Sequence, residues 1–323
     1  MKPIEVVCMG LSSVDVSVRG HLKETFFTQS CTQADSVSIC VGGDAINQAQ
    51  TLARLGHSVA YMGSVGRDAA GECILTQAKA AGVDMSRVRV LDDVASAICV
   101  TMIDDGDDRH SVPSTAMSSN KAFCLGTVDL DAVRAAKVVS FGSLFCFPKL
   151  SDQDLEAIFA AAKAGGALTC ADMKLIEGAA MEQFGRALKQ LDYLFANKDE
   201  AAAFSGRDVP EDMADYFLGL GVGHVIVKLG GRGCLIKGGG ECRRVPPFYV
   251  KPVDTTGAGD NFAAGFISAL CRGLPFAACA RFASATAAIT VQSIGSSTGV
   301  KSMEQVLSFI EQYPGEAGKK KTT

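Results

Sequence analysis

Short apolar segments and helical segments alternate along most of this chain, and the alternation limits the possible folds more than any other feature. Runs such as AKVVSFGS, ALTCADM and LDYLFAN are each long enough for one buried strand. Segments such as NQAQTLARLG and SDQDLEAIFAAAKAGG have helical periodicity and end at glycine. Strands joined by helices form a mostly parallel sheet covered on both faces, with ligands at the carboxyl ends of the strands. We therefore expect an α/β fold, with IEVVCMG as its first strand and SVAYMGSVG as its second.

The composition fits a globular protein and excludes several other classes. The 323 residues are enough for one large α/β domain, and 48% of them are hydrophobic. The net charge is only −4, which argues against partners such as nucleic acid or a membrane surface. We find no signal peptide and no apolar run of the ~18 residues that a membrane span needs. The 12 cysteines include no Cys-x-x-Cys pair, which fits free thiols and a cytoplasmic location.

Two regions, about residues 14–41 and 95–115, depart from this alternation. Both carry β-branched residues at alternating positions, and DDGDD in the second is typical of a hairpin turn. We expect the two regions to pair into a small β-lobe beside the main sheet. The alternative is a pair of surface loops.

The segment DTTGAGD is followed directly by NFAAGFISALC, which has helical periodicity. Gly257, Ala258 and Gly259 are small enough for the backbone to approach a ligand closely, and the unpaired N–H groups of a helix start form an anion site. Asp260 suits a base that takes a proton from a hydroxyl while those N–H groups stabilise a transferring phosphoryl group. The alternative is a glycine-rich turn in which Asp260 is the helix N-cap.

A second glycine-rich segment, VGGDAINQA, places Gly42 and Gly43 before a predicted helix and Asn47 in its first turn. Asp15 follows the first predicted strand. A carboxylate, an amide and exposed N–H groups suit a ligand with many hydroxyls, because each hydroxyl can donate and accept. An ordinary turn with a loop aspartate would give the same pattern.

Two further segments suit a nucleotide. In ANKDEA, Asn197 and Glu200 could act on Mg²⁺ through water, or could be a helix N-cap and a first-turn acid. In KLGGRG, Gly230 and Gly233 lie between two predicted strands, where the turn could pass phosphates or be a simple hairpin.

Taken together, these segments resemble the ribokinase family of carbohydrate kinases, also called the phosphofructokinase B-type family. The order of these motifs matches the order in the family over nearly the whole chain, from the Asp after the first strand to Asp-Thr-x-Gly-Ala-Gly-Asp near the end. The resemblance implies one kinase domain over residues 1–323, with a three-layer α/β/α core and a small β-lid over the sugar. It also implies transfer of the γ-phosphoryl group of ATP to a sugar hydroxyl.

The resemblance assigns roles to single residues. Asp260 matches the catalytic base, and residues 257–259 match the anion hole. The sugar-binding matches are Asp15, Gly42, Gly43 and Asn47, and the nucleotide-side matches are Lys228, Gly230 and Gly233. Ser284 stands at an adenine-side position where many members have a different residue.

Two metals are implied in the same way. Asn197 and Glu200 match the magnesium and phosphate motif. Asp254 and Thr256 match positions that ligate a potassium-like ion in many members. The matching carbonyl donors for that ion are Ser293 and Gly295.

The chain departs from its relatives at positions that bear on the substrate. Ser143 stands where true ribokinases have a glutamate after a strand, and the sequence Phe-Gly-Ser at this point is closer to that of fructokinase-like members. Ketodeoxygluconate kinases carry an arginine in the stretch that is HSVPSTAMS here, and Arg109, slightly upstream, could serve instead. The sugar, or sugar acid, therefore stays open.

Three functions remain at this point. The leading one is a sugar kinase that acts as a homodimer through the lid, because apolar alternation leaves strand edges that a monomer would have to protect. A nucleoside kinase on the same fold would use Phe141, Phe145 and Phe147 as pocket walls. A non-catalytic sugar or nucleotide sensor is the third.

Overall fold

The computed structural model describes residues 3–20, 28–104, 109–114, 118–175 and 181–313, apart from the side chains of Arg109 and Glu182. In this part of the chain, the alternation of strands and helices builds one eight-stranded sheet in the order β14-β13-β12-β11-β10-β9-β1-β4. Neighbours from β4 to β12 are parallel, and β13 and β14 join antiparallel. The strands are β1 (Val6–Met9), β4 (Val59–Met62), β9 (Val138–Phe141), β10 (Leu168–Asp172), β11 (Tyr193–Asn197), β12 (His224–Lys228), β13 (Cys234–Gly238) and β14 (Glu241–Val245).

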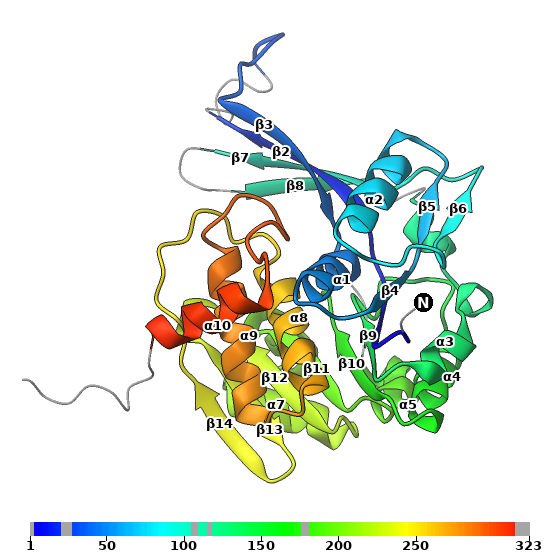
Figure 1. The fold of residues 1–323 in the computed structure, drawn as a ribbon, viewed down its shortest axis with the longest axis vertical. Coiled ribbons are helices and arrows are strands. Elements are labelled where there is room, and N and C mark those ends of the chain that lie inside the picture. Colours follow the sequence, from blue (N-terminus) through cyan, green and yellow to red (C-terminus); the bar gives the residue numbers. More distant parts are fainter. Residues whose placement is uncertain (1–2, 21–27, 105–108, 115–117, 176–180, 314–323) are drawn as a thin grey trace, which may run out of the picture.

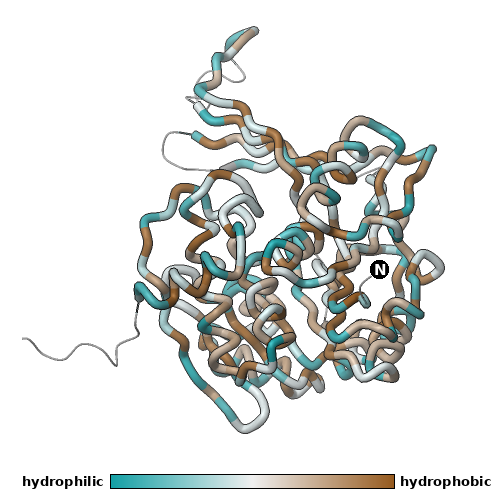
Figure 2. Tube along the Cα trace, viewed as in Figure 1, coloured by the Kyte–Doolittle hydropathy of each residue, from teal (hydrophilic) through white to brown (hydrophobic). Residues whose placement is uncertain are grey.

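Helices cover both faces of this sheet, because successive strand residues point to opposite sides. In β1, Val6 and Cys8 join one buried cluster and Val7 and Met9 join the other. The resulting three layers are visible in Figure 1, and Figure 2 shows apolar residues along the central strands. Residues of the first cluster come from α1 (Asp44–Arg54), α2 (Ala69–Ala80), α8 (Ala258–Cys271), α9 (Phe276–Thr290) and α10 (Met303–Gln312). Residues of the second cluster come from α3 (Leu130–Ala135), α4 (Asp152–Ala164), α5 (Gly185–Leu188), α6 (Lys198–Ser205) and α7 (Pro210–Gly219).

A separate four-stranded sheet, here called the lid sheet, projects from the main body (Figure 1). Its strand order is β3-β2-β7-β8, and β2 pairs in parallel with β7, more than 80 residues later in the chain. The segments 21–27 and 105–108, within the two regions expected to form a β-lobe, lie outside the described residues. The strands of the lid sheet are β2 (Ser13–Arg19), β3 (Ser36–Gly42), β7 (Ile98–Ile103) and β8 (Arg109–Pro113).

The two faces of the lid sheet differ in polarity, because paired residues on neighbouring strands point to the same side. The pairing aligns Asp15 with Cys99 and Pro113 on one face. On the other face it aligns Ile39, Val16, Val100 and Val112 in one row. Ile39 is 62% exposed and Val112 is 51% exposed. One face of the lid sheet is therefore apolar and largely open to solvent.

The segment SVAYMGSVG is not the single strand expected from its sequence. The chain leaves the central sheet after β4, and Ser64–Gly66 (β5) pairs with Arg89–Leu91 (β6) in a small sheet of its own. The carbonyl oxygen of Gly63, at the break, accepts the N–H of Arg89 at 3.0 Å. Over the described ranges, the helices are all too short or too polar to cross a membrane.

Candidate active site

A cavity of about 1340 Å³ lies between the carboxyl ends of the central strands and the lid sheet. Asp172 and Lys228 reach it from the ends of β10 and β12, and Asp15 and Pro113 reach it from the polar face of the lid sheet. Pockets for one small ligand usually have about 300–1,000 Å³. The cavity therefore has room for two ligands side by side.

The segment DTTGAGD forms the helix start from which an anion site was predicted. Gly257 is the N-cap residue, in the left-handed region with φ 72°, and a Cβ there would collide with the carbonyl oxygen of Ser296. Glycine is required at this position, and Ala258 and Gly259, which follow it in the first turn, line the cavity. The Ala258 N–H donates to the Thr255 carbonyl oxygen at 3.3 Å. The Lys228 ammonium lies 3.0 Å from the place that a Cβ on Gly259 would occupy. Positive charge from the helix dipole and from Lys228 therefore meets at one point.

Asp260 lies in the first turn of α8, three residues after the N-cap Gly257, which makes no side-chain cap. The interpretation of Asp260 as the helix N-cap is therefore wrong. Its Oδ2 accepts the Asn47 Nδ2–H at 2.8 Å. Burial raises the pKa of Asp260 above the usual aspartate range, and the Asn47 hydrogen bond and the charges of Lys228 and Lys174 oppose part of that rise. A carboxylate with a raised pKa is a stronger base once it is ionised.

Hydrogen bonds between distant segments fix the orientation of Asn47. Ser296 Oγ, fully buried, lies 3.0 Å from both Asn47 Oδ1 and the carbonyl oxygen of Val41. Because Oδ1 faces this hydroxyl, Nδ2 is the atom that faces Asp260. Next to it, Asn261 Nδ2 donates to the carbonyl oxygens of Gly257 at 2.7 Å and Ser296 at 2.6 Å. Sequence reasoning missed Ser296 and Asn261, since no local pattern marks them.

On the lid side, the structure brings Asp15 and Gly42 together. A Cβ at Gly42 would overlap the Asp15 carboxylate, so glycine leaves the space that this side chain fills. Ser13 Oγ donates to Asp15 Oδ1 at 2.8 Å, and burial raises the pKa of Asp15. Gly43 is the N-cap of α1 and lines the cavity with Asp15. Arg109 begins β8, at the end opposite Pro113, and its side chain lies outside the described part of the structure.

The sequence had pointed only to Ser143 among three further polar residues that line this side of the cavity: Asp44, Ser143 and Asp172. They come from α1, from the loop after β9 and from the end of β10. Burial, and next the charge of Asp260, raises the pKa of Asp44 to about 6. Asp172 is buried, and its pKa is raised well above the usual range.

At the other end of the cavity, Asn197 and Glu200 form a capping box at the start of α6. Asn197 Oδ1 accepts the Glu200 N–H and Glu200 Oε2 accepts the Asn197 N–H, both at 2.8 Å. The predicted helix cap is therefore present, and both residues also line the cavity. The second carboxylate oxygen of Glu200 takes no part in the capping box. Burial raises the pKa of Glu200, and Lys228 partly lowers it. An oxygen of this kind suits Mg²⁺ bound through water.

The turn after β12 also reaches the cavity, through Gly230 and Gly233. It joins antiparallel strands β12 and β13, so the predicted hairpin is confirmed. Ser284 lines the cavity from α9, and its Oγ donates to the Ala280 carbonyl at 2.9 Å within the helix. Apolar residues complete the walls here: Pro247, Phe248, Val250, Pro252, Ala287, Ala288 and Val291.

A family model, described as pfkB family carbohydrate kinase, matches residues 4–303. The chain belongs to the pfkB family of carbohydrate kinases. This kinase is therefore an enzyme that phosphorylates an alcohol group, which excludes the hypothesis of a non-catalytic sensor. The family predicted from the order of motifs is confirmed.

Relatives of this kinase differ in their named substrates. It is 25% identical to a ribokinase of Haemophilus influenzae over 84% of this chain and 88% of that protein. It is 28% identical to a 2-dehydro-3-deoxygluconokinase of Bacillus subtilis over 84% of this chain and 86% of that protein. The structure of Arabidopsis thaliana ribokinase complexed with ribose and ATP superposes with a TM-score of 0.83, at 26% identity, and covers 96% of this chain and 99% of that one. The predicted ribokinase-like fold is therefore confirmed.

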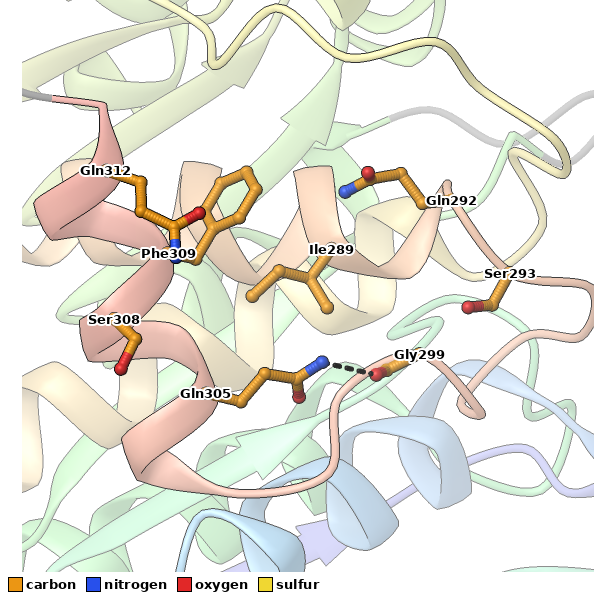
Figure 3. Close-up of a pocket in the computed structure, with 8 residues that line it drawn as sticks. All are labelled: Ile289, Gln292, Ser293, Gly299, Gln305, Ser308, Phe309 and Gln312. Atoms are coloured by element: carbon orange, nitrogen blue, oxygen red, sulfur yellow. Dashed lines mark hydrogen bonds between the residues drawn. The ribbon is translucent and has the colours of Figure 1, made fainter.

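The candidate monovalent-ion residues of this kinase lie behind the anion site. Asp254 is buried and accepts the N–H groups of Thr256 at 2.9 Å and Gly295 at 3.0 Å, so it joins the two segments. Ser293 lines a smaller cavity of about 350 Å³ between α9 and α10, with Gln292 and Gln305 (Figure 3). Among the described residues, no three His, Cys, Asp or Glu side chains form a metal-binding group.

The three phenylalanines that a nucleoside kinase would use do not reach the cavity. Phe141, Phe145 and Phe147 all lie in the described part of the chain, and each packs into the buried cluster on the α3–α7 side of the sheet. Phe141 and Phe147 contact each other edge to face at 5.4 Å, and Phe145 packs on Phe184 at 4.3 Å. These three phenylalanines therefore do not form walls on the sugar side of the cavity.

Proposed function

We propose that this kinase transfers the γ-phosphoryl group of ATP to a hydroxyl of a small sugar or sugar acid, with Asp260 as the catalytic base. The observation that carries the proposal is the position of Asp260. Its carboxylate lies in the first turn of α8, beside the anion site and at the junction of the polar and apolar parts of one large cavity.

The reaction follows from this geometry. Asp260 accepts the proton of the sugar hydroxyl, and the oxygen attacks the γ-phosphorus in line with the bridging oxygen of ADP. The bond to that bridging oxygen breaks and ADP leaves. The N–H groups at the start of α8 and the Lys228 ammonium stabilise the charge that develops on the phosphoryl oxygens.

Different parts of the cavity suit the two substrates. Asp15, Gly42, Gly43 and Asn47 gather under the lid sheet, where hydroxyl groups would find donors and acceptors. The apolar walls near Ser284, together with Gly230 and Gly233, suit the adenine and the phosphates of ATP. The role predicted for Arg109 from the sequence, contact with a sugar acid, belongs to the same proposal.

Two cations fit the oxygen donors of this kinase. Mg²⁺ bound through water at Asn197 and Glu200 would neutralise charge on the ATP phosphates. A potassium-like ion would find oxygen atoms near Asp254, Thr256, Ser293 and Gly295 and would stabilise the turn at Gly257. Replacement of potassium by a bulky organic cation should then lower kcat.

We also propose a homodimer through the lid sheet. The apolar row that contains Ile39 and Val112 lies on the face away from the cavity, and a second copy could cover it without blocking the substrates. Exposed apolar patches of this kind mark interaction surfaces. Light scattering that finds only monomer at micromolar concentration would contradict the dimer and leave the kinase activity untouched.

A substrate panel tests the proposed activity. Pentoses, hexoses, keto-deoxy sugar acids and nucleosides are each incubated with ATP and Mg²⁺, and ADP release that depends on the acceptor is measured. We expect a free sugar or sugar acid to have the highest kcat/KM. A nucleoside better by tenfold, about 1.4 kcal/mol, would favour a nucleoside kinase instead.

A further inference from the structure

The wall of the cavity near Asp260 contains a residue in an unusual conformation. Ser143 has a φ of 50°, and it is the one non-glycine residue with a positive φ in the part of the chain that the structure describes. Serine rarely adopts this region, because its Cβ crowds the backbone, and such residues persist only where their surroundings hold them. Ser143 is also fully buried.

Asp172 holds Ser143 in place. Its Oδ1 accepts the backbone N–H of Ser143 at 2.5 Å, and its Oδ2 accepts the Gln48 Nε2–H at 2.5 Å. Gln48 is oriented in turn by Ser140, whose Oγ donates to Gln48 Oε1 at 2.6 Å. Each oxygen of Asp172 thus accepts one hydrogen bond from inside the protein, and the residue is only 6% exposed, so a ligand has little access to its remaining capacity. Asp172 is placed to orient its neighbours rather than to bind a ligand.

Asp44 is the group that this arrangement orients toward the cavity. Ser143 Oγ donates to Asp44 Oδ2, and the Ala45 N–H donates to Asp44 Oδ1 at 2.8 Å. A carboxylate oxygen can accept two hydrogen bonds, so each oxygen of Asp44 retains capacity for one more. Asp44 lines the cavity and is only partly buried, so a ligand can reach that capacity.

The position of Asp44 relative to Asp260 follows from α1. Asp44 and Asn47 are three residues apart on the helix, so their side chains are neighbours on one face, with Cβ atoms about 5–6 Å apart. Asn47 contacts Asp260 directly. Asp44 and Asp260 are thus both neighbours of Asn47, they line the same cavity, and the charge of one acts on the other, so two hydroxyls of one small sugar can meet them.

We propose that Asp44 binds a second hydroxyl of the sugar, near the hydroxyl that Asp260 deprotonates, and that Ser143 and Asp172 are positioning residues that hold it there. The inference rests on the proposed function and extends it. It makes Asp44 a determinant of which polyhydroxylated sugar is bound, and not a participant in phosphoryl transfer.

The test compares variants with the sugar that wild type phosphorylates fastest among D-ribose, D-fructose and 2-keto-3-deoxygluconate. For Asp44→Asn, we expect KM for that sugar to rise roughly tenfold to a hundredfold, because a hydrogen bond to a charged acceptor is lost, while kcat stays within about threefold. The KM for ATP should not change. The matched control is Asp208→Asn, which removes an exposed carboxylate away from the cavity and should change neither constant.

Ser143→Gly separates positioning from folding. Glycine accepts a positive φ without strain, so this variant should fold with the same loop conformation. It lacks the hydroxyl that orients Asp44, so KM for the sugar should still rise, by roughly threefold to tenfold. A purely structural role for Ser143 predicts instead an unchanged KM.

Two results would overturn the inference alone: a sugar KM within twofold of wild type in both variants, or a fall in kcat with KM unchanged. Monodeoxy forms of the chosen sugar give a further check. One of them should be used equally well by wild type and Asp44→Asn, and a wild-type advantage over Asp44→Asn that persists with every monodeoxy form would also contradict the assignment. If wild type phosphorylates none of the three sugars and none of the wider panel, the proposed function fails and this inference fails with it.

Discussion

The catalytic edge of the central sheet and the lid sheet are built in opposite ways. At the catalytic edge, side-chain hydrogen bonds determine position: Ser296 orients Asn47, which faces Asp260, and Asp172 orients Ser143, which contacts Asp44. In the lid sheet, strand pairing determines position, and side chains such as Ile39 extend into solvent. A reacting oxygen must be held to a fraction of an ångström, whereas a sheet that covers a ligand must be able to move. Buried, hydrogen-bonded polar groups therefore characterise the proposed catalytic edge, whereas exposed apolar side chains characterise the lid sheet.

The largest effect should come from removing the proposed base, Asp260. Asp260→Asn keeps the shape of the side chain but cannot accept the proton, so kcat should fall by roughly 10²–10⁴, with the sugar KM little changed. Steady-state kinetics and a thermal unfolding curve measure both properties. Near-native kcat would show that another group is the base, and loss of folding would show that Asp260 is structural.

The lid sheet should respond in assembly rather than in chemistry. Ile39→Lys places a charge in the apolar row of β3, so the dimer Kd should rise by roughly a hundredfold or more, as expected for burying an unpaired charge. Ser36→Lys, on the same strand but on the opposite face, is the matched control. Sedimentation equilibrium of the three proteins checks the result. Equal dissociation constants for both variants would mean that this face is not the interface.

A smaller effect should follow when the orientation of Asn47 is released. Ser296→Ala removes the hydroxyl that faces Asn47 Oδ1, so the amide no longer donates reliably to Asp260. That hydrogen bond holds the pKa of Asp260 down against burial. We expect kcat/KM to fall roughly tenfold, the worth of one hydrogen bond, and its acidic limb to move to higher pH. An unchanged pH profile would contradict the coupling.

The smallest effect concerns stability. The pKa of Asp44 is raised to about 6, so the folded protein binds this proton more tightly than the unfolded chain, and stability is lost as pH rises from about 4 to 6. Asp260, Asp172 and Lys174 act on the same carboxyl group, and none of them is changed in Asp44→Asn. This variant should be more stable than wild type by about 1 kcal/mol at pH 7.5, with the difference vanishing near pH 4. Urea unfolding at the two pH values measures it, and equal differences at both would exclude Asp44 as the cause.

Much of the fold was predictable, because strand and helix signals are local. The apolar runs at 138–141, 168–172 and 193–197 became β9, β10 and β11, and the glycine-rich start of α8 was recognised from its own residues. The break between β4 and β5 was not predicted. It depends on β6, a strand more than 20 residues later, and not on the apolar pattern of the segment itself.

The family, the central sheet and the glycine-rich helix start that contains Asp260 could be predicted from the sequence, since each depends on residues that are neighbours in the chain. Only the tertiary structure decided which polar groups meet. Ser143 contacts Asp44 across 99 residues and Ser296 contacts Asn47 across 249 residues. In the tertiary structure, Phe145 and Phe147 also lie in the core, and Asp44 lines the cavity. The physical reason is that a buried polar group must find its hydrogen-bond partners wherever the sheet order brings them, and no local pattern encodes that order.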